Sequence, residues 1–104
     1  MKPTPEEYHQ SDHFKFETSS NIMFRELEDE SVILNLNDES YYSLNSTGTV
    51  IWNLLQSSSS LKEAFLTFKS KFEVEPSKAS SDFNHLIHEL VEKKFGALEK
   101  TQSP

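Results

Sequence analysis

The first half of the sequence alternates between apolar and polar residues in three short runs. The runs are NIMFREL at residues 21–27, SVILNL at 31–36 and SYYSL at 40–44. Alternation with a period of two predicts β-strands, because successive side chains of a strand point to opposite faces. The segments EDE and NDE separate the runs, and their Asn and acidic residues favour tight turns. We therefore expect a three-stranded antiparallel meander.

The pattern changes to the period of an α-helix at Asn45. This residue is a suitable N-cap, and the apolar residues at positions 50, 51, 54 and 55 recur at helical spacing. A second helix is predicted to begin at Ser60, because Ser60 and Glu63 have the spacing of a capping box. Its apolar stripe consists of positions 61, 64, 65, 68 and 72.

A third helix is predicted for residues 77–94, after Pro76, which suits a first helical turn. Its apolar stripe consists of positions 79, 83, 86, 87, 90 and 91, and Gly96 stands where a glycine C-cap is expected. The predicted fold is α+β, with the order β-β-β-α-α-α. Three short helices cannot cover both faces of the sheet, and a meander has two edges, so we expect at least one edge to be open to solvent.

The composition indicates one small domain. The chain has 104 residues, of which 35% are apolar, and its eight Phe, three Tyr and one Trp supply much of the area that can be buried. Both ends of the sequence are polar. We predict a domain at residues 21–98 between flexible tails at 1–20 and 99–104.

The charge balance is acidic, with a formal net charge of −7. This charge repels the phosphate backbone of nucleic acids and anionic membrane surfaces, so we expect neither as a partner. The sequence has no Cys, which excludes disulfides, thiol nucleophiles and zinc knuckles. It contains neither a long apolar run nor a signal peptide, and we expect a cytoplasmic protein.

The sequence lacks the motifs of common catalytic sites. No Ser lies in a G-x-S-x-G turn, and a chain with only two Gly has no phosphate-binding glycine loop. His85 and His88 are three residues apart on the third predicted helix, near Asp82, Glu89 and Glu92, but H-x-x-H lacks the further ligands of a specific metal motif. We expect no enzyme activity, no metal and no cofactor.

Three segments carry motifs in a characteristic order. They are LNDESYYSLNSTGTVIW at 36–52, SLKEAFLTFKSKFEVEP at 60–76 and SDFNHLIHELVEKKFG at 81–96. Together they resemble the PqqD-like family, which is also called the precursor-peptide recognition element of ribosomal peptide modification pathways. The resemblance covers residues 24–98. The family typically ends its last helix with Gly-Leu, whereas Ala97 intervenes here.

The resemblance implies a compact winged-helix-like domain without catalysis of its own. Such a domain holds the leader segment of a precursor peptide and presents it to a modifying enzyme. The partner enzyme would be a radical SAM enzyme, as in quinone-cofactor synthesis, or a leader peptidase, as in lasso-peptide synthesis. The present chain would act in trans, and we expect a monomer; a dimer through open sheet edges is the alternative.

In this family the peptide adds to the edge of the third strand, and a groove lies between that strand and the last helix. Carried over, the resemblance implies a receiving strand consisting of Ser40, Tyr41, Tyr42, Ser43 and Leu44. Backbone hydrogen bonds supply affinity in this mode of binding, and neighbouring pockets select side chains. By alternation, Tyr42 shares a face with Leu44 and belongs to the core. Tyr41 faces the other way, either toward a ligand or as a packing residue only.

On the third predicted helix we expect Phe83 and Leu86 to form walls of the groove, and Asp82 and Glu89 to be charges at its rim. The alternatives are a purely structural role for the apolar pair and ordinary solvation for the acidic pair. A net acidic rim would favour a leader with Lys or Arg near its apolar anchors.

Two other functions stay open. A winged-helix DNA-binding regulator would use the third helix, which offers Asn84, Lys93 and Lys94, although its acidic residues and the net charge oppose contact with DNA. The second is a protein–protein adaptor that uses the same sheet edge for a folded partner.

Overall fold

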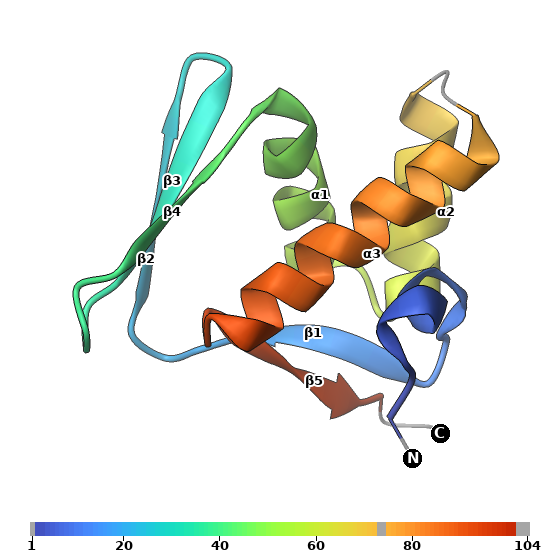
Figure 1. The fold of residues 1–104 in the computed structure, drawn as a ribbon, viewed down its shortest axis with the longest axis horizontal. Coiled ribbons are helices and arrows are strands. Elements are labelled where there is room, and N and C mark those ends of the chain that lie inside the picture. The colour runs from blue at the N-terminus through green and yellow to red at the C-terminus, as the bar shows by residue number, and fades with distance from the viewer. Residues whose placement is uncertain (1, 73–74, 102–104) are drawn as a thin grey trace.

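The computed structural model describes residues 2–72 and 75–101. Its elements, in chain order, are η1 (Pro5–Gln10), β1 (Phe14–Thr18), β2 (Ile22–Leu27), β3 (Glu30–Asn35), β4 (Tyr41–Leu44), α1 (Ser46–Ser57), α2 (Leu61–Lys71), α3 (Pro76–Glu92) and β5 (Gly96–Lys100). Figure 1 shows the helices on one side of the β2–β3–β4 sheet, with the β1–β5 ribbon beneath them. Part of the predicted acidic turn before Pro76, residues 73–74, lies outside the described residues.

The predicted meander is confirmed. Strands β2, β3 and β4 form an antiparallel sheet in that order, with Phe24 opposite Ile33 and Ile33 opposite Tyr42. The three predicted helices follow it, so the α+β class and the core of the predicted element order are also confirmed. The inner face of the sheet packs on α1. There Phe24 stacks on Trp52 with ring centroids 5.7 Å apart.

A second, two-stranded sheet contradicts the expectation of a flexible tail at residues 1–20. Strand β1 pairs with β5 along its whole length, and η1 precedes it. The side chain of Phe16 is only 5% exposed and contacts Trp52 edge-to-face, and Tyr8 is also buried. These aromatic side chains bury enough apolar area to hold an otherwise polar segment on the domain. The expected tail at 99–104 begins inside β5, and residues 102–104 lie outside the described part.

Gly96 does not cap α3, as the sequence suggested. The helix ends at Glu92, and the residue with positive φ in the segment that follows is Lys94, at 65°. Gly96 instead begins β5, where a Cβ atom would collide with the Phe16 ring and lie 2.7 Å from the carbonyl oxygen of Glu17. A glycine is needed at this position because the two strands and the Phe16 ring approach closely.

The predicted helix caps are largely confirmed. The side-chain oxygen of Asn45 accepts a hydrogen bond from the Gly48 N–H at 2.8 Å. The Ser60 hydroxyl oxygen accepts one from the Glu63 N–H at 3.1 Å. The Glu63 carboxylate accepts from the N–H of Ser59 at 2.7 Å, so the reciprocal bond of the capping box is displaced by one residue.

Helix α3 is held on its far side by the N-terminal segment. The side chain of Asn84 accepts from the His9 N–H at 2.8 Å and donates to the Glu6 carbonyl oxygen at 3.1 Å. Its amide nitrogen also lies 2.8 Å from His9 Nδ1. Asn84 is buried as a result. Within residues 2–72 and 75–101, the structure contains no helix with the length and apolar character of a membrane span.

Candidate functional site

Strand β4 has only one hydrogen-bonded neighbour, β3, among the described strands. The Asn35 N–H donates to the Ser40 carbonyl oxygen at 2.8 Å, which fixes the phase of the ladder. Backbone groups of an antiparallel strand point alternately toward and away from its partner. Those of Tyr42 therefore point to β3, whereas the N–H and C=O groups of Tyr41 and Ser43 point out from the edge.

The side chains of β4 alternate between two environments. Leu44 is buried, and Tyr42 lies partly buried against Phe95, with ring centroids 6.1 Å apart. The Tyr41 side chain is 70% exposed on the opposite face. The predicted division of the two tyrosines between the faces of the sheet is therefore confirmed.

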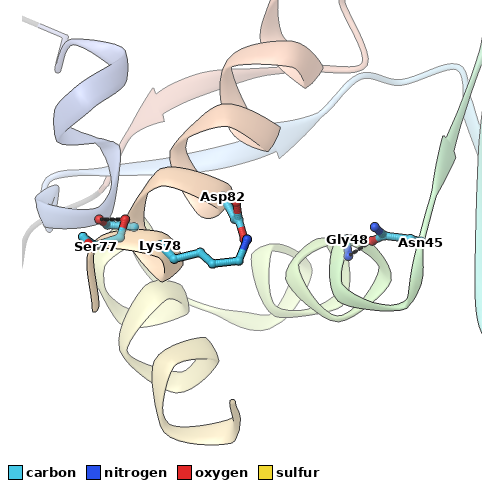
Figure 2. Close-up of polar contacts among 6 residues, drawn as sticks. Asn45, Gly48, Ser77, Lys78 and Asp82 are labelled. Atoms are coloured by element: carbon cyan, nitrogen blue, oxygen red, sulfur yellow. Dashed lines mark hydrogen bonds and ion pairs between the residues drawn. The ribbon is translucent and has the colours of Figure 1, made fainter. Parts of the chain in front are cut away.

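A groove of about 450 Å³ lies beside β4, bounded by the start of α1 and by α3. Its apolar lining comes mainly from Leu44, Ile51, Phe68, Phe72 and Leu86, and polar groups stand around it. Figure 2 shows the α3 pair Lys78 and Asp82 on the side of that helix that faces the Asn45–Gly48 cap of α1. Other strands of the molecule also have a free edge, but β4 combines its edge with this apolar groove.

The structure brings five of the nine predicted site residues into the groove. These are Tyr42, Ser43, Leu44, Asp82 and Leu86. Ser40 lies just before β4, and its hydroxyl and amide groups donate to the Asp38 carboxylate at 2.7 and 2.9 Å. These bonds hold the pKa of Asp38 below its ordinary value. Tyr41 lies on the outer side of the same strand.

Phe83 is not a groove wall. Its side chain is 0% exposed and packs between the rings of Phe65 and Phe68, at centroid distances of 5.3 and 6.3 Å. The apolar stripe of α3 is wide enough to contact more than one element. Its centre packs against α2, and not against β4. Only its flank at Leu86 reaches the groove.

The rim of the groove is not net acidic, in contrast to the expectation. Asp82 pairs with Lys78, one turn earlier, at 3.0 Å. Glu89, which lies near Tyr42 but does not line the groove, pairs with Lys93 at 3.4 Å. Each predicted rim acid thus has a lysine partner at i,i+4 spacing. These exposed pairs contribute little to stability, but they cancel the local charge.

Tyr42 is a titratable, partly buried side chain of the groove. Burial raises its pKa above the ordinary value of 10.0, the negative charge of Glu89 raises it further, and Lys93 opposes this. The Tyr42 hydroxyl therefore stays protonated at neutral pH. It can act there as a hydrogen-bond donor.

The sequence interpretation missed several residues of the groove. Lys78 and His85 come from α3, Thr47 and Gly48 from the first turn of α1, and Phe72 from the end of α2. The i,i+4 spacing of Lys78 and Asp82 was readable as an ion pair. The contribution of α2 had no local sequence signature, because it depends on the packing of three helices.

Both histidines of α3, His85 and His88, line a cleft between α3 and η1, and His85 also borders the groove. Across the part of the chain that the structure describes, no three His, Asp or Glu side chains are grouped in a way that could hold a metal ion.

These features define a small α+β domain with an antiparallel sheet, a free edge strand and an apolar groove between that strand and the longest helix. The profile of the family "Coenzyme PQQ synthesis protein D (PqqD)" matches residues 30–95, more than half of the chain. The chain therefore belongs to the PqqD family, and the resemblance found in its motifs is confirmed.

Two solved structures share this fold. One is described as "TbiB1 in Complex with the TbiA(beta) Leader Peptide"; it is 22% identical, with a TM-score of 0.70, and the match covers 77% of this chain and 93% of that one. The other, "Lasso peptide synthetase B1 complexed with the leader peptide", is 24% identical, with a TM-score of 0.70 and coverage of 79% and 96%. No curated protein matches the sequence.

Proposed function

We propose that this protein binds the leader segment of a ribosomally made precursor peptide by β-strand addition to β4 and presents it to a modifying enzyme or a leader peptidase. The observation that carries the proposal is the free edge of β4 beside an apolar groove. An extended guest would pair with the outward backbone groups of Tyr41 and Ser43. Its alternate side chains would enter the groove.

The groove supplies selectivity in this proposal. Leu44 and Leu86 offer apolar surface for an aliphatic or aromatic side chain, and Tyr42 offers a hydroxyl donor. The Lys78–Asp82 pair presents both signs of charge at the rim. A leader with an apolar anchor therefore fits better than one selected by positive charge alone.

The family and the two structural matches support a peptide partner. Both solved structures are complexes with leader peptides by their descriptions. The groove contains Ser43, His85 and Asp82, but no hydrogen bond joins these three side chains, as a nucleophile and its base would require. The Asp82 carboxylate is instead bound by Lys78 at 3.0 Å. We accordingly infer a binding protein whose chemistry is supplied by its partner, a radical SAM enzyme or a peptidase.

The DNA-binding alternative is less well supported by the same geometry. A recognition helix must present polar side chains to base edges. On α3, Asn84 is buried and bound to η1, and Lys93, directly after the helix, is paired with Glu89. The side of α3 next to β4 lines the apolar groove.

The test is a binding titration with a fluorescein-labelled synthetic peptide that covers the N-terminal half of a short precursor encoded beside the gene. Trp52 is a poor reporter because it is buried and does not line the groove. We expect saturable binding with a Kd of roughly tens of micromolar or tighter, about −6 kcal/mol or more favourable. No saturation in that range, with salt-sensitive binding to duplex DNA instead, would favour the DNA-binding alternative.

A further inference from the structure

No helix or strand of the described chain covers the face of the β2–β3–β4 sheet that points away from the helices (Figure 1). The register places Met23, Leu34 and Tyr41 in one row across the three strands. Leu27 and Leu36 lie an even number of residues from this row, so their side chains point to the same face. We call this surface the outer face. It consists of Met23, Arg25, Leu27, Glu30, Val32, Leu34, Leu36, Tyr41 and Ser43.

The exposed apolar residues of the molecule are concentrated on the outer face. Met23, Leu27 and Leu36 are 50%, 52% and 52% exposed, and Tyr41 is 70% exposed. Within the described residues, the other large apolar side chain of comparable exposure is Leu66 on α2, at 52%. Exposed apolar residues are unremarkable when they are scattered singly, whereas a contiguous group marks an interaction surface.

The composition of the outer face is that of a protein–protein contact. Tyr, Met and Arg are enriched in the buried centres of such interfaces, and Arg and Tyr recur among the residues that dominate binding energy. Arg25 lies on this face, is exposed, and takes part in no ion pair among the described residues. It is therefore available to a carboxylate or carbonyl acceptor of a partner.

The charges at the two ends of the outer face indicate which kind of partner can bind there. The β2–β3 turn carries Glu28 and Asp29, and the β3–β4 turn carries Asp38 and Glu39 at the opposite end of the sheet. A second copy of the chain would bring acidic turns together whichever way its strands ran, because both ends are acidic. Like charges across an interface oppose association, so a partner with basic groups is favoured over a copy.

We propose that the outer face is the docking surface for a folded protein that carries an apolar strip between two clusters of Lys or Arg, with an acceptor opposite Arg25. If the proposed function is correct, this partner is the enzyme that receives the peptide. The identity of the partner rests on the proposed function, whereas the docking surface itself does not. The row of Tyr41 ends at the free edge of β4, so the partner would sit next to a peptide added to that edge.

The test measures binding of the immobilised full-length chain to each enzyme encoded beside its gene, purified singly. The variant is Met23→Glu, and the matched control is Leu66→Glu, a similarly exposed apolar residue on α2. We expect one enzyme to bind, Met23→Glu to weaken it by about tenfold or more, and Leu66→Glu to change it by less than about twofold. Circular dichroism should show both variants folded. Met23→Glu should bind the labelled leader peptide like the wild type.

Several results would overturn the inference. These are no binding by any of the enzymes, equal weakening by the two variants, or strengthening when Glu28 and Asp29 are both changed to Lys. Sedimentation that shows a wild-type dimer dissolved by Met23→Glu would make the outer face a contact between copies and would also refute it. If the peptide binds but no enzyme does, this inference fails and peptide binding stands. If an enzyme binds and Met23→Glu weakens its binding, but the peptide does not bind, the outer face stands as a docking surface and the proposed peptide binding fails.

Discussion

A cleft along the β1–β5 ribbon is larger than the groove at β4, but it is the weaker candidate for binding a peptide. The cleft along the β1–β5 ribbon has a volume of about 720 Å³, against about 450 Å³ for the groove at β4. Its lining is charged or hydroxylic, with Lys15, Glu17, Glu99 and Lys100 from the ribbon and serines 58–60 from the α1–α2 loop. The groove at β4 is lined by buried leucine, isoleucine and phenylalanine side chains.

The two sheets differ in where their apolar side chains lie. The ribbon turns Phe16 and Leu98 into the core, and its outward face carries Lys15, Glu17, Ala97 and Glu99. The β2–β3–β4 sheet has apolar side chains on both faces, and its edge strand borders apolar surface that nothing in the described chain covers. Under the proposed function, the ribbon is therefore structural and the three-stranded sheet is the binding element.

The largest expected effect tests the structural role of the ribbon. Phe16→Ala removes a buried ring that contacts Trp52, and we expect the free energy of unfolding to fall by about 3–5 kcal/mol. Urea denaturation measures it, with Lys15→Ala on the exposed face of the same strand as the control. A change below about 1 kcal/mol for Phe16→Ala would show that the N-terminal segment adds little to stability, as expected for a flexible tail.

A smaller loss is expected from the close approach within the ribbon. In Gly96→Ala the added methyl group meets the Phe16 ring and the backbone oxygen of Glu17, so we expect a loss of about 1–3 kcal/mol. Thermal denaturation of this variant should be compared with Gly48→Ala, where the nearest atom to an added Cβ is a leucine methyl at 3.2 Å. Equal stability of Gly96→Ala and the wild type would contradict the observed packing.

The edge of β4 is tested by a substitution that leaves the core intact. Tyr41→Pro removes an N–H that points out from the sheet, so we expect leader-peptide affinity to fall by about tenfold or more, about 1.4 kcal/mol. The unfolding free energy should change much less. Tyr42→Pro is the contrasting control, since it removes an N–H directed at β3 and should destabilise the sheet. Unchanged peptide affinity in Tyr41→Pro would move the binding site elsewhere.

The smallest effect concerns alkaline pH. Burial raises the pKa of Tyr42 and of Tyr8 above 10.0, with Glu89 and Glu92 adding to the respective shifts. A raised pKa means that the folded state binds the tyrosine proton more tightly than the unfolded state does. The contribution of each tyrosine to stability is therefore complete below about pH 10 and is lost as the pH rises through the folded-state pKa. We expect unfolding free energy to decline above about pH 10, and Tyr42→Phe to decline less. Identical pH profiles would exclude a contribution from Tyr42.

Local features of the fold could be predicted from the sequence, and long-range ones could not. The Asn45 cap, the α2 stripe and the meander follow from spacings within about ten residues. The ribbon pairs Phe16 with Leu98, and no local pattern indicates a partner that lies at the other end of the chain. Tyr8, Phe14 and Phe16 are the aromatic residues of an otherwise polar segment, which by composition resembles a flexible tail.

The candidate site was predictable as a strand and a helix, but not in its detail. The family resemblance indicated β4 and α3, and alternation placed Tyr41 and Tyr42 on opposite faces. The position of Phe83 depends on how α3 rotates against α2, which the width of an apolar stripe does not fix. The outer face also escaped prediction, because Leu34 and Leu36 alternate as a core-facing set would.

The most direct test of strand addition is amide hydrogen exchange of β4, measured by NMR with and without the leader peptide. In the free protein, the Tyr42 and Leu44 amides should be protected by β3, and those of Tyr41 and Ser43 should exchange quickly. Saturating peptide should slow exchange at Tyr41 and Ser43. If the peptide binds while these two amides exchange as fast as before, the account of peptide recognition at β4 is wrong.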